Sequence, residues 1–319
     1  MLRAYSLTNS KELSQRLNDK SFFSLERQLA AEFVRQNAVP VSTNVAKPCP
    51  LCDSDNTVLF AVIDNVSYLR CCDCWSIFIP VCQEIIEEYR NYSPIIALRS
   101  SDEYQDIARM KRERIWQELC FWLQFRTARY SGSNKELSVI DIGNRYEGLR
   151  EQIQSLFNSY CPCDTINDAK YKADIVLFFT QIQYCTEPIT EFIKISDKLN
   201  SNGLLYLSAR VGNGFDVLTL KSATDTIFPY EHALLPSVDG LYIALEKSGF
   251  EVLEIISPGS LDLRYVMENM DALSDDNLLL RYLYEKLDEQ TLLEFQSFLQ
   301  KANLSSHARI VARKREGGG

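Results

Sequence analysis

The chain has 319 residues, of which 46% are hydrophobic and 24% are charged, and its formal net charge is −9. This composition is typical of a globular protein with a substantial core, and the acidic balance argues against a nucleic-acid partner, which needs a basic face. No apolar stretch reaches the roughly 18–20 residues that span a membrane, and the polar start (TNSKE) argues against a signal peptide. We therefore expect a cytoplasmic protein.

The N-terminal third contains helical patterns on both sides of a cysteine-rich segment. Apolar residues spaced by three to four predict a helix over 10–37, and a linker follows at 40–48. Short β-like runs lie at 58–60 and 76–79. A long helix is expected over 101–129, because Ser101 can cap it and the acidic pair after Ser101 suits the positive end of the helix dipole.

The ten cysteines of a protein in a reducing compartment point to a metal site rather than to disulfides. Cys49 and Cys52 form one C-x-x-C pair, Cys71 and Cys74 form another, and 18 residues lie between the pairs. This spacing predicts a zinc ribbon in which a closed four-thiolate zinc site supports the structure and not catalysis. Buried thiols or a redox pair are the alternatives, and Cys72 could replace Cys71 as a ligand.

The second half of the chain alternates between strand and helix patterns. This alternation predicts an α/β fold with a mostly parallel, Rossmann-like sheet. A further helical stretch at 274–303 precedes a last strand at 308–312. The expected strands are 137–142, 174–179, 203–209 and 251–256, and the expected helices between them are 146–157, 188–199 and 238–248.

Two segments resemble one known family. The run KPCPLC…YLRCCDCWSIFIP (47–80) is similar to the N-terminal zinc ribbon of some class I S-adenosylmethionine (SAM)-dependent methyltransferases, although DCW stands where the family has C-G. The segment 200–266 resembles their fourth and fifth strands, the loop after them, the last helix and the sixth strand. Sugar C-methyltransferases share this arrangement, and the resemblance covers 47–313. The ribbon matches are Tyr68, Cys71, Cys74, Phe78 and Pro80.

The resemblance implies a class I methyltransferase sheet preceded by a helical and zinc-ribbon module. The helical stretch would be inserted between the last two strands. The expected parts are an N-terminal helical segment at 1–47, the zinc ribbon at 48–82, a helical connector at 83–134, a methyltransferase-like domain at 135–313 with a helical insert at 263–304, and a tail or tag remnant at 314–319.

The resemblance also implies that SAM binds at a glycine-rich turn after the first strand of the sheet. The corresponding stretch, DIGNRYEGL, retains Asp141, Gly143 and Gly148, but larger residues replace the rest of the turn. Each lost glycine removes both backbone freedom and close approach to a ligand. We therefore expect a degenerate SAM site, and a purely structural turn fits these residues equally well.

The segment after this turn is unusually short. Only 30 residues lie between Gly143 and Asp174, where the family has two strands and two helices. An acid at the end of the second strand would bind the ribose hydroxyls, and the candidates are Asp168 and Asp164 beside a short strand at 165–167. We expect the preceding Cys-Pro-Cys run at 161–163 to be a loop.

The motif PYEH supplies the candidate catalytic residues. In similar sugar C-methyltransferases a histidine with nearby tyrosine and glutamate acts as acid and base at the acceptor, which carries over to His232, Glu231 and Tyr230. A neutral imidazole can accept a proton near neutral pH. The alternative is that His232 packs a loop. The second of the two histidines, His307, precedes the last strand and is expected to be structural.

Two functions follow from these patterns. The first is a divergent SAM-dependent methyltransferase that acts on a small sugar-nucleotide or polysaccharide-precursor acceptor. The second is a catalytically inactive descendant, a pseudoenzyme, that keeps zinc and serves as a partner or scaffold in a biosynthetic complex. The PYEH motif favours the first function, and the shortened cofactor region favours the second.

Overall fold

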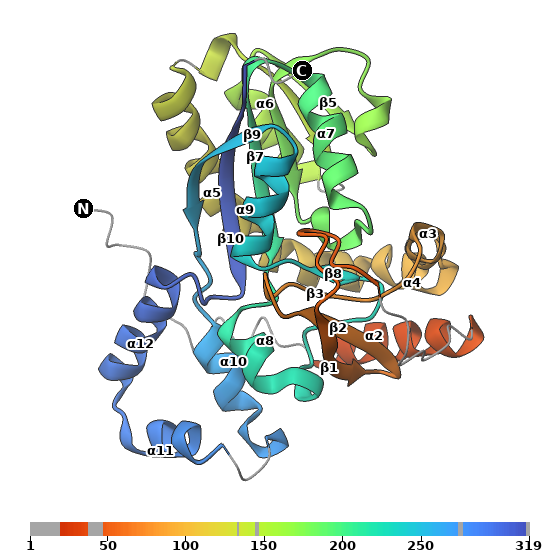
Figure 1. Cartoon of the computed structure of the whole chain (residues 1–319), viewed down its shortest axis with the longest axis vertical. Helices are drawn as coiled ribbons and strands as arrows, with labels where there is room; N and C mark the ends of the chain where they lie inside the picture. Colours follow the sequence, from red (N-terminus) through yellow and green to blue (C-terminus); the bar gives the residue numbers. More distant parts are fainter. Residues whose placement is uncertain (1–19, 38–46, 133, 144–146, 274–276, 317–319) are drawn as a thin grey trace.

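The computed structural model describes residues 20–37, 47–132, 134–143, 147–273 and 277–316. Figure 1 shows a central sheet with helices on both faces, a second small sheet beside it, and a helical arm at the lower left. Residues 10–19 of the first predicted helix lie outside the described ranges. Within those ranges, no helix has both the length and the apolar character to cross a membrane.

The central sheet has six strands in the order β5-β4-β6-β7-β10-β9. The neighbours from β5 to β7 are parallel, whereas β10 runs antiparallel to both β7 and β9. The predicted Rossmann-like α/β class is therefore confirmed. The strands are β4 (Ser138–Ile142), β5 (Ser159–Cys163), β6 (Ala173–Phe179), β7 (Leu199–Arg210), β9 (Phe250–Ile256) and β10 (His307–Lys314).

Helices cover both faces of this sheet (Figure 1). On one face Trp122 of α5 packs edge-on against Tyr206 of β7, and its neighbour Leu123 is fully buried. On the other face Phe192 of α7 and Leu241 of α9 join the core that the strands share with the cysteine-rich module. The covering helices are α5 (Asp102–Ser131), α6 (Glu147–Leu156), α7 (Pro188–Lys198) and α9 (Val238–Lys247).

The second sheet joins the cysteine-rich segment to a strand from much later in the chain. Its order is β1-β2-β3-β8, with Ile77 paired to Leu235 and Phe78 to Leu234. Gly212 lies against this junction, because a Cβ there would be 2.6 Å from the Leu235 carbonyl oxygen. The strands are β1 (Thr57–Ile63), β2 (Val66–Cys71), β3 (Ile77–Phe78) and β8 (Leu234–Leu235).

Helices from the N-terminal third pack beside this second sheet and form another hydrophobic cluster. Phe33 of α2 contacts the rings of Tyr89 and Tyr230 edge-on, with centroids 5.3 Å and 5.5 Å away. The helices are α2 (Lys20–Gln36), α3 (Gln83–Arg90) and α4 (Ser93–Arg99). Short turns elsewhere are η1 (Asn134–Glu136), η3 (Ile182–Tyr184) and η4 (Lys221–Ala223).

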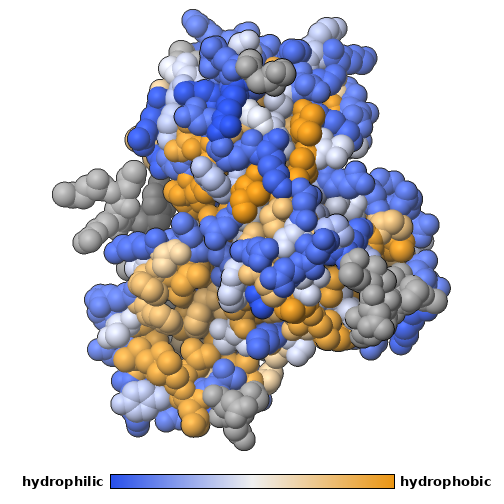
Figure 2. Space-filling model, viewed as in Figure 1, coloured by the Kyte–Doolittle hydropathy of each residue, from blue (hydrophilic) through white to orange (hydrophobic). Residues whose placement is uncertain are grey.

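A helical insert lies between β9 and β10 and packs beside α8. Figure 2 shows apolar residues gathered over this part of the molecule. The exposed apolar side chains of the insert include Leu278, Leu279, Tyr282 and Phe298. The elements are α8 (Phe215–Leu220), α10 (Asp262–Glu268), η5 (Met270–Ala272), α11 (Leu278–Lys286) and α12 (Glu289–Lys301).

Two predictions for the short segment after β4 were wrong. The Cys-Pro-Cys run at 161–163 belongs to strand β5, and residues 165–167 are not a strand but overlap the 3-10 turn η2 (Ile166–Asp168). Proline is tolerated because β5 is at the edge of the sheet, where one side of the strand needs no ladder donor. The described residues 147–172 contain only α6, β5 and η2, so the segment is as short as its length predicted.

Ser237 joins the small sheet to α9. Its Oγ accepts the Gly240 N–H at 2.8 Å as the α9 N-cap and donates to the Cys74 carbonyl. We expect Ser237→Ala to lower the free energy of unfolding by about 1–2 kcal/mol and to weaken amide-exchange protection over 66–78. Asp288→Ala removes the α12 N-cap and is the matched control. Equal loss of protection over 66–78 in both variants would contradict this role.

Candidate functional site

The four predicted metal-ligating cysteines meet at one point. The Sγ atoms of Cys49, Cys52, Cys71 and Cys74 all lie within 4.8 Å of one another. Two of the Sγ–Sγ distances are 3.5 Å, close to the separation of thiolates around a tetrahedral ion with bonds of about 2.3 Å. The donor set therefore fits one metal ion, and Cys72 is not part of it.

Two similar turns bring these thiols together. In the first, the Cys49 N–H donates to the Ser54 carbonyl; in the second, the Cys71 N–H donates to the Ser76 carbonyl, both at 2.9 Å. The residues after the second cysteine of each pair, Asp53 and Trp75, have φ values of 65° and 67°. Both residues thus adopt the left-handed conformation that glycine takes most readily, although neither is a glycine.

The PYEH loop leads directly into β8, so the small sheet determines where the loop lies. The backbone N–H of Phe228 donates to Nδ1 of His232 at 3.2 Å, and the two rings stack. The side chain is half-buried. Burial, with a contribution from the positive charge of Arg210, lowers the pKa of His232 to about 3. The imidazole is therefore neutral over the physiological range.

Glu231 is held in an ion-pair network. Arg99 donates to its Oε2 at 2.7 Å and to Glu26 of α2, and the Tyr184 hydroxyl donates to its other oxygen. Burial alone would raise the pKa of Glu231, but Arg99, His232 and Tyr184 hold it below the ordinary value. The carboxylate thus joins the loop to the N-terminal helices.

Tyr230 points away from its neighbours in the motif. The residue is fully buried, with φ of 65°, and its ring packs against Phe33 and Tyr89. Its hydroxyl is buried and has no hydrogen-bond partner in the described part of the chain. This environment is that of a core residue, although PYEH is continuous in sequence.

The turn after β4 is covered by a side chain from the neighbouring strand end. Gly143 has φ of 65°, and its N–H donates to the Cys163 carbonyl at 2.7 Å. A Cβ at Gly143 would lie 2.4 Å from Cδ of Gln181, which follows β6. The positive φ favours glycine here, and the Gln181 atoms over it are the far end of a flexible side chain. Gly148 lies in the first turn of α6, and the residues between the two glycines, 144–146, are outside the described ranges.

The three acids of the predicted cofactor site have different surroundings. Asp141 is buried on β4 and accepts the Tyr160 hydroxyl at 2.6 Å. Asp168 is exposed, and its carboxylate accepts the backbone N–H and the hydroxyl of Thr165, both at 2.9 Å. Asp164 directly follows β5 and is also exposed. Asp164 is thus at the carboxyl edge of the sheet, where open α/β sheets bind ligands.

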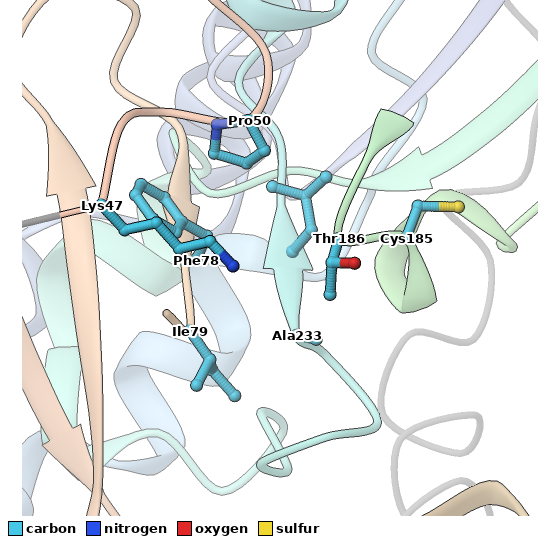
Figure 3. Close-up of a pocket in the computed structure, with 8 residues that line it drawn as sticks. Lys47, Pro50, Phe78, Ile79, Cys185, Thr186 and Ala233 are labelled. Atoms are coloured by element: carbon cyan, nitrogen blue, oxygen red, sulfur yellow. The ribbon is translucent and has the colours of Figure 1, made fainter. Parts of the chain in front are cut away.

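A small hollow lies between the small sheet and the loop after β6. Figure 3 shows Pro50 and Phe78 on one side, Cys185 and Thr186 on the other, and Ala233 near its base. Its empty volume is about 250 Å³ including the open solvent at its mouth, so the enclosed space is far below the roughly 300–1,000 Å³ of typical small-molecule sites. The hollow therefore does not by itself accommodate a nucleoside cofactor.

One residue that the sequence analysis expected to be structural lies near the candidate site. His307 begins β10, and its backbone position pairs directly with Arg210 at the end of β7. Arg210 also acts on His232, so both histidines of the chain are near the same guanidinium. The available signal was the rarity of histidine in this chain, because two histidines that both flank strand ends can meet at one sheet edge.

Comparison with known proteins gives matches of structure alone. No protein-family model matches the sequence. No curated protein matches it either. Similar solved structures include a protein described as a sarcosine dimethylglycine methyltransferase from Galdieria sulphuraria, with 11% identity, 63% of this chain and 86% of that chain covered, and a TM-score of 0.40.

Phosphoethanolamine N-methyltransferase 2 of Haemonchus contortus is 17% identical, with 59% of this chain and 51% of that chain covered and a TM-score of 0.39. A chain of the complex between the Haloferax volcanii Trm112 methyltransferase activator and a methyltransferase is 11% identical, with 68% and 99% covered and a TM-score of 0.42. At these levels of similarity the function has to be inferred from the residues of the chain itself.

We expect the purified chain to hold one divalent metal ion per molecule at the four thiols. Cys49→Ser combined with Cys52→Ser should remove the ion and lower the unfolding temperature, because a closed thiolate site contributes directly to folding. Metal analysis and thermal unfolding measure both effects. Cys82→Ser is the control, since Cys82 is exposed and outside the cluster. Full metal content in the double variant would contradict the ligand assignment.

The lowered pKa of His232 predicts that stability falls in mild acid. Between about pH 6.5 and the folded-state pKa of about 3, the unfolded chain binds a proton that the folded chain excludes. The free energy of unfolding should therefore fall as pH decreases through this window. We expect His232→Gln to reduce the slope in denaturant titrations at pH 4–7. An unchanged slope would contradict the environment assigned to His232.

Proposed function

We propose that the chain is a divergent SAM-dependent methyltransferase that acts on a small acceptor of the sugar-nucleotide or polysaccharide-precursor class. The observation that carries the proposal is the position of Gly143 between β4 and α6. Gly143 lies at the carboxyl edge of the parallel strands and has a positive φ. Open α/β sheets bind nucleotide cofactors at such turns.

The residues assigned to the cofactor are Asp141, Gly143 and Gly148, with Asp164 or Asp168 at the ribose. When bound, SAM supplies an electrophilic methyl group. Gln181 has to move for SAM to reach the Gly143 backbone, and the atoms in contact are the far end of a flexible side chain. Its Nε2 donates to the Gly143 carbonyl at 3.4 Å and to the Phe179 carbonyl at 3.2 Å, and this movement breaks the first of these bonds.

The PYEH loop supplies the acceptor side of the proposed site. His232 faces the acceptor in this proposal, Glu231 holds the loop to α2 and α4, and Tyr230 supports it from the core. The metal at the four cysteines is zinc, because a closed tetrathiolate set suits zinc. Its role is structural: it rigidifies the sheet from which β8 and the PYEH loop extend.

The ten thiols, none of which forms a disulfide, support a cytoplasmic location.

The second candidate function is a pseudoenzyme that acts as a partner or scaffold in a biosynthetic complex. The Gln181 side chain over Gly143 and the single strand between α6 and β6 favour it. The two functions differ in one measurable property, which is the affinity for SAM.

Titration calorimetry with SAM and S-adenosylhomocysteine tests the proposal. We expect weak binding to the wild type and at least about tenfold tighter binding to Gln181→Ala, because the variant opens the space over Gly143. Gly143→Arg should abolish binding in both backgrounds. Gln183→Ala, two residues away, is the matched control.

The absence of heat from both the wild type and Gln181→Ala at millimolar SAM, with the metal bound and the chain folded, would overturn the methyltransferase proposal. That result would favour the scaffold function. Binding that Gly143→Arg leaves intact would place the cofactor elsewhere and would also contradict the assignment.

A further inference from the structure

Both histidines of the chain lie beside Arg210 at the carboxyl edge of the central sheet. His307 is opposite Arg210 in the antiparallel β7–β10 pair, and side chains of directly opposed residues share one face of a sheet. His232 is close enough that the charges of Arg210 and His307 both affect it. Arg210, His232 and His307 thus form one cluster, although 22 to 97 positions of the chain separate each pair of them.

The described residues accept hydrogen bonds from only some of the N–H groups of Arg210. Its Nη2 donates to Asp216 at 2.8 Å and to Thr226 at 2.7 Å. Its Nε is buried and has no hydrogen-bond partner in the parts of the chain that the structure describes. A guanidinium with spare donors is a natural site for a carboxylate or phosphate oxygen.

The hydrogen bonds give the two imidazoles different capacities. Nδ1 of His232 accepts the Phe228 N–H, so the neutral ring carries its proton on Nε2 and can only donate there. Nδ1 of His307 lies 3.3 Å from Oγ of Ser306. If His307 donates to that hydroxyl, its Nε2 keeps a lone pair and can accept a proton.

The helical insert holds His307 in this position. Oδ1 of Asp262 accepts the Ser306 N–H at 2.6 Å, and its Oδ2 accepts Gln296 of α12 at 2.7 Å. The His307 side chain retains exposed surface, yet enough protein surrounds it that burial lowers its pKa to about 4. His307 is thus open to a ligand on one side and surrounded by protein on the other.

We propose that Arg210, His232 and His307 form the acceptor centre, which takes a small molecule bearing a carboxylate or phosphate, and that His307 is its proton acceptor. Arg210 and the Nε2–H of His232 bind the acceptor, and Ser306 and Asp262 are positioning residues. The inference rests on the proposed methyltransferase function for its chemical step. It differs from the sequence interpretation, which assigned acid–base chemistry to His232.

The chemical step combines a proton transfer to His307 with a methyl transfer to the acceptor. A proton leaves an O–H, N–H or C–H group of the acceptor for Nε2 of His307, and the electron pair stays on the acceptor atom. That pair bonds to the methyl carbon of SAM, and the electrons of the breaking carbon–sulfur bond remain on sulfur.

The charged groups around each ring explain why the acceptor itself has to be anionic. His232 faces Arg210, Glu231 and His307, and His307 faces Arg210, Asp262 and Arg309. Arg210 acts on both rings to keep them neutral. An oxyanion bound to Arg210 offsets its charge, so the rings gain proton affinity when the acceptor arrives.

Long-range proton–nitrogen NMR of the full chain tests the proposal, because only two imidazoles contribute. We expect the Nε2–H tautomer for His232 and the Nδ1–H tautomer for His307, and His307→Gln assigns the signals. Ser306→Ala should convert His307 to a mixture of tautomers. Inorganic phosphate or trifluoroacetate, both anionic at the pH of these titrations, should raise both midpoints by about 1 pH unit relative to chloride of equal ionic strength.

Two arginine variants provide the controls. Arg210→Gln should remove the anion effect on both rings, whereas Arg309→Gln should move the midpoint of His307 alone. A shift with phosphate but not trifluoroacetate would assign the acceptor anion as a phosphate, and shifts with both would support any oxyanion. An Nε2–H tautomer for His307, or equal shifts with chloride, would overturn the proposal. None of these samples contains SAM, so failure of SAM binding is a separate result.

Discussion

The pairing of β8 with β3 is the contact on which the candidate site depends. Residues 234–235 leave the central domain and complete the sheet of the four-cysteine module, and Ile79 donates its N–H to the Ala233 carbonyl at 2.8 Å. Only Ala233 therefore separates His232 from a strand of the four-cysteine module. The module thus positions a loop of the central domain, which is a more direct role than that of a separate appended domain.

A second constraint is the buried charge network around Arg99. This side chain bridges Glu26 of α2 and Glu231 of the PYEH loop. Removing one member of a buried ion pair leaves an unpaired charge and costs several kcal/mol, so the N-terminal helices and the loop are energetically coupled. The same network explains why Glu231 is a poor proton acceptor.

Local patterns predicted most of the fold. The C-x-x-C spacing identified all four clustered thiols, and apolar runs located β4, β6, β7, β9 and β10, because period-two and 3.6-residue patterns depend on local burial. Strand β5 was missed because Cys-Pro-Cys at 161–163 resembles a turn, and only its edge position makes the proline acceptable. The function of Tyr230 was predicted from its place in PYEH, but backbone direction, which the motif does not encode, turns its ring into the core.

The sequence by itself determined the α/β class, the four cysteines that cluster and the shortened segment after β4, since spacing and chain length impose these directly. Only the tertiary structure decided which distant residues meet. Strand register brings His307 opposite Arg210, β8 joins the PYEH loop to the cysteine module, and the end of β6 lays Gln181 over Gly143. Each of these contacts joins segments far apart in the chain, and their register depends on the packing of the whole sheet, which no local pattern contains.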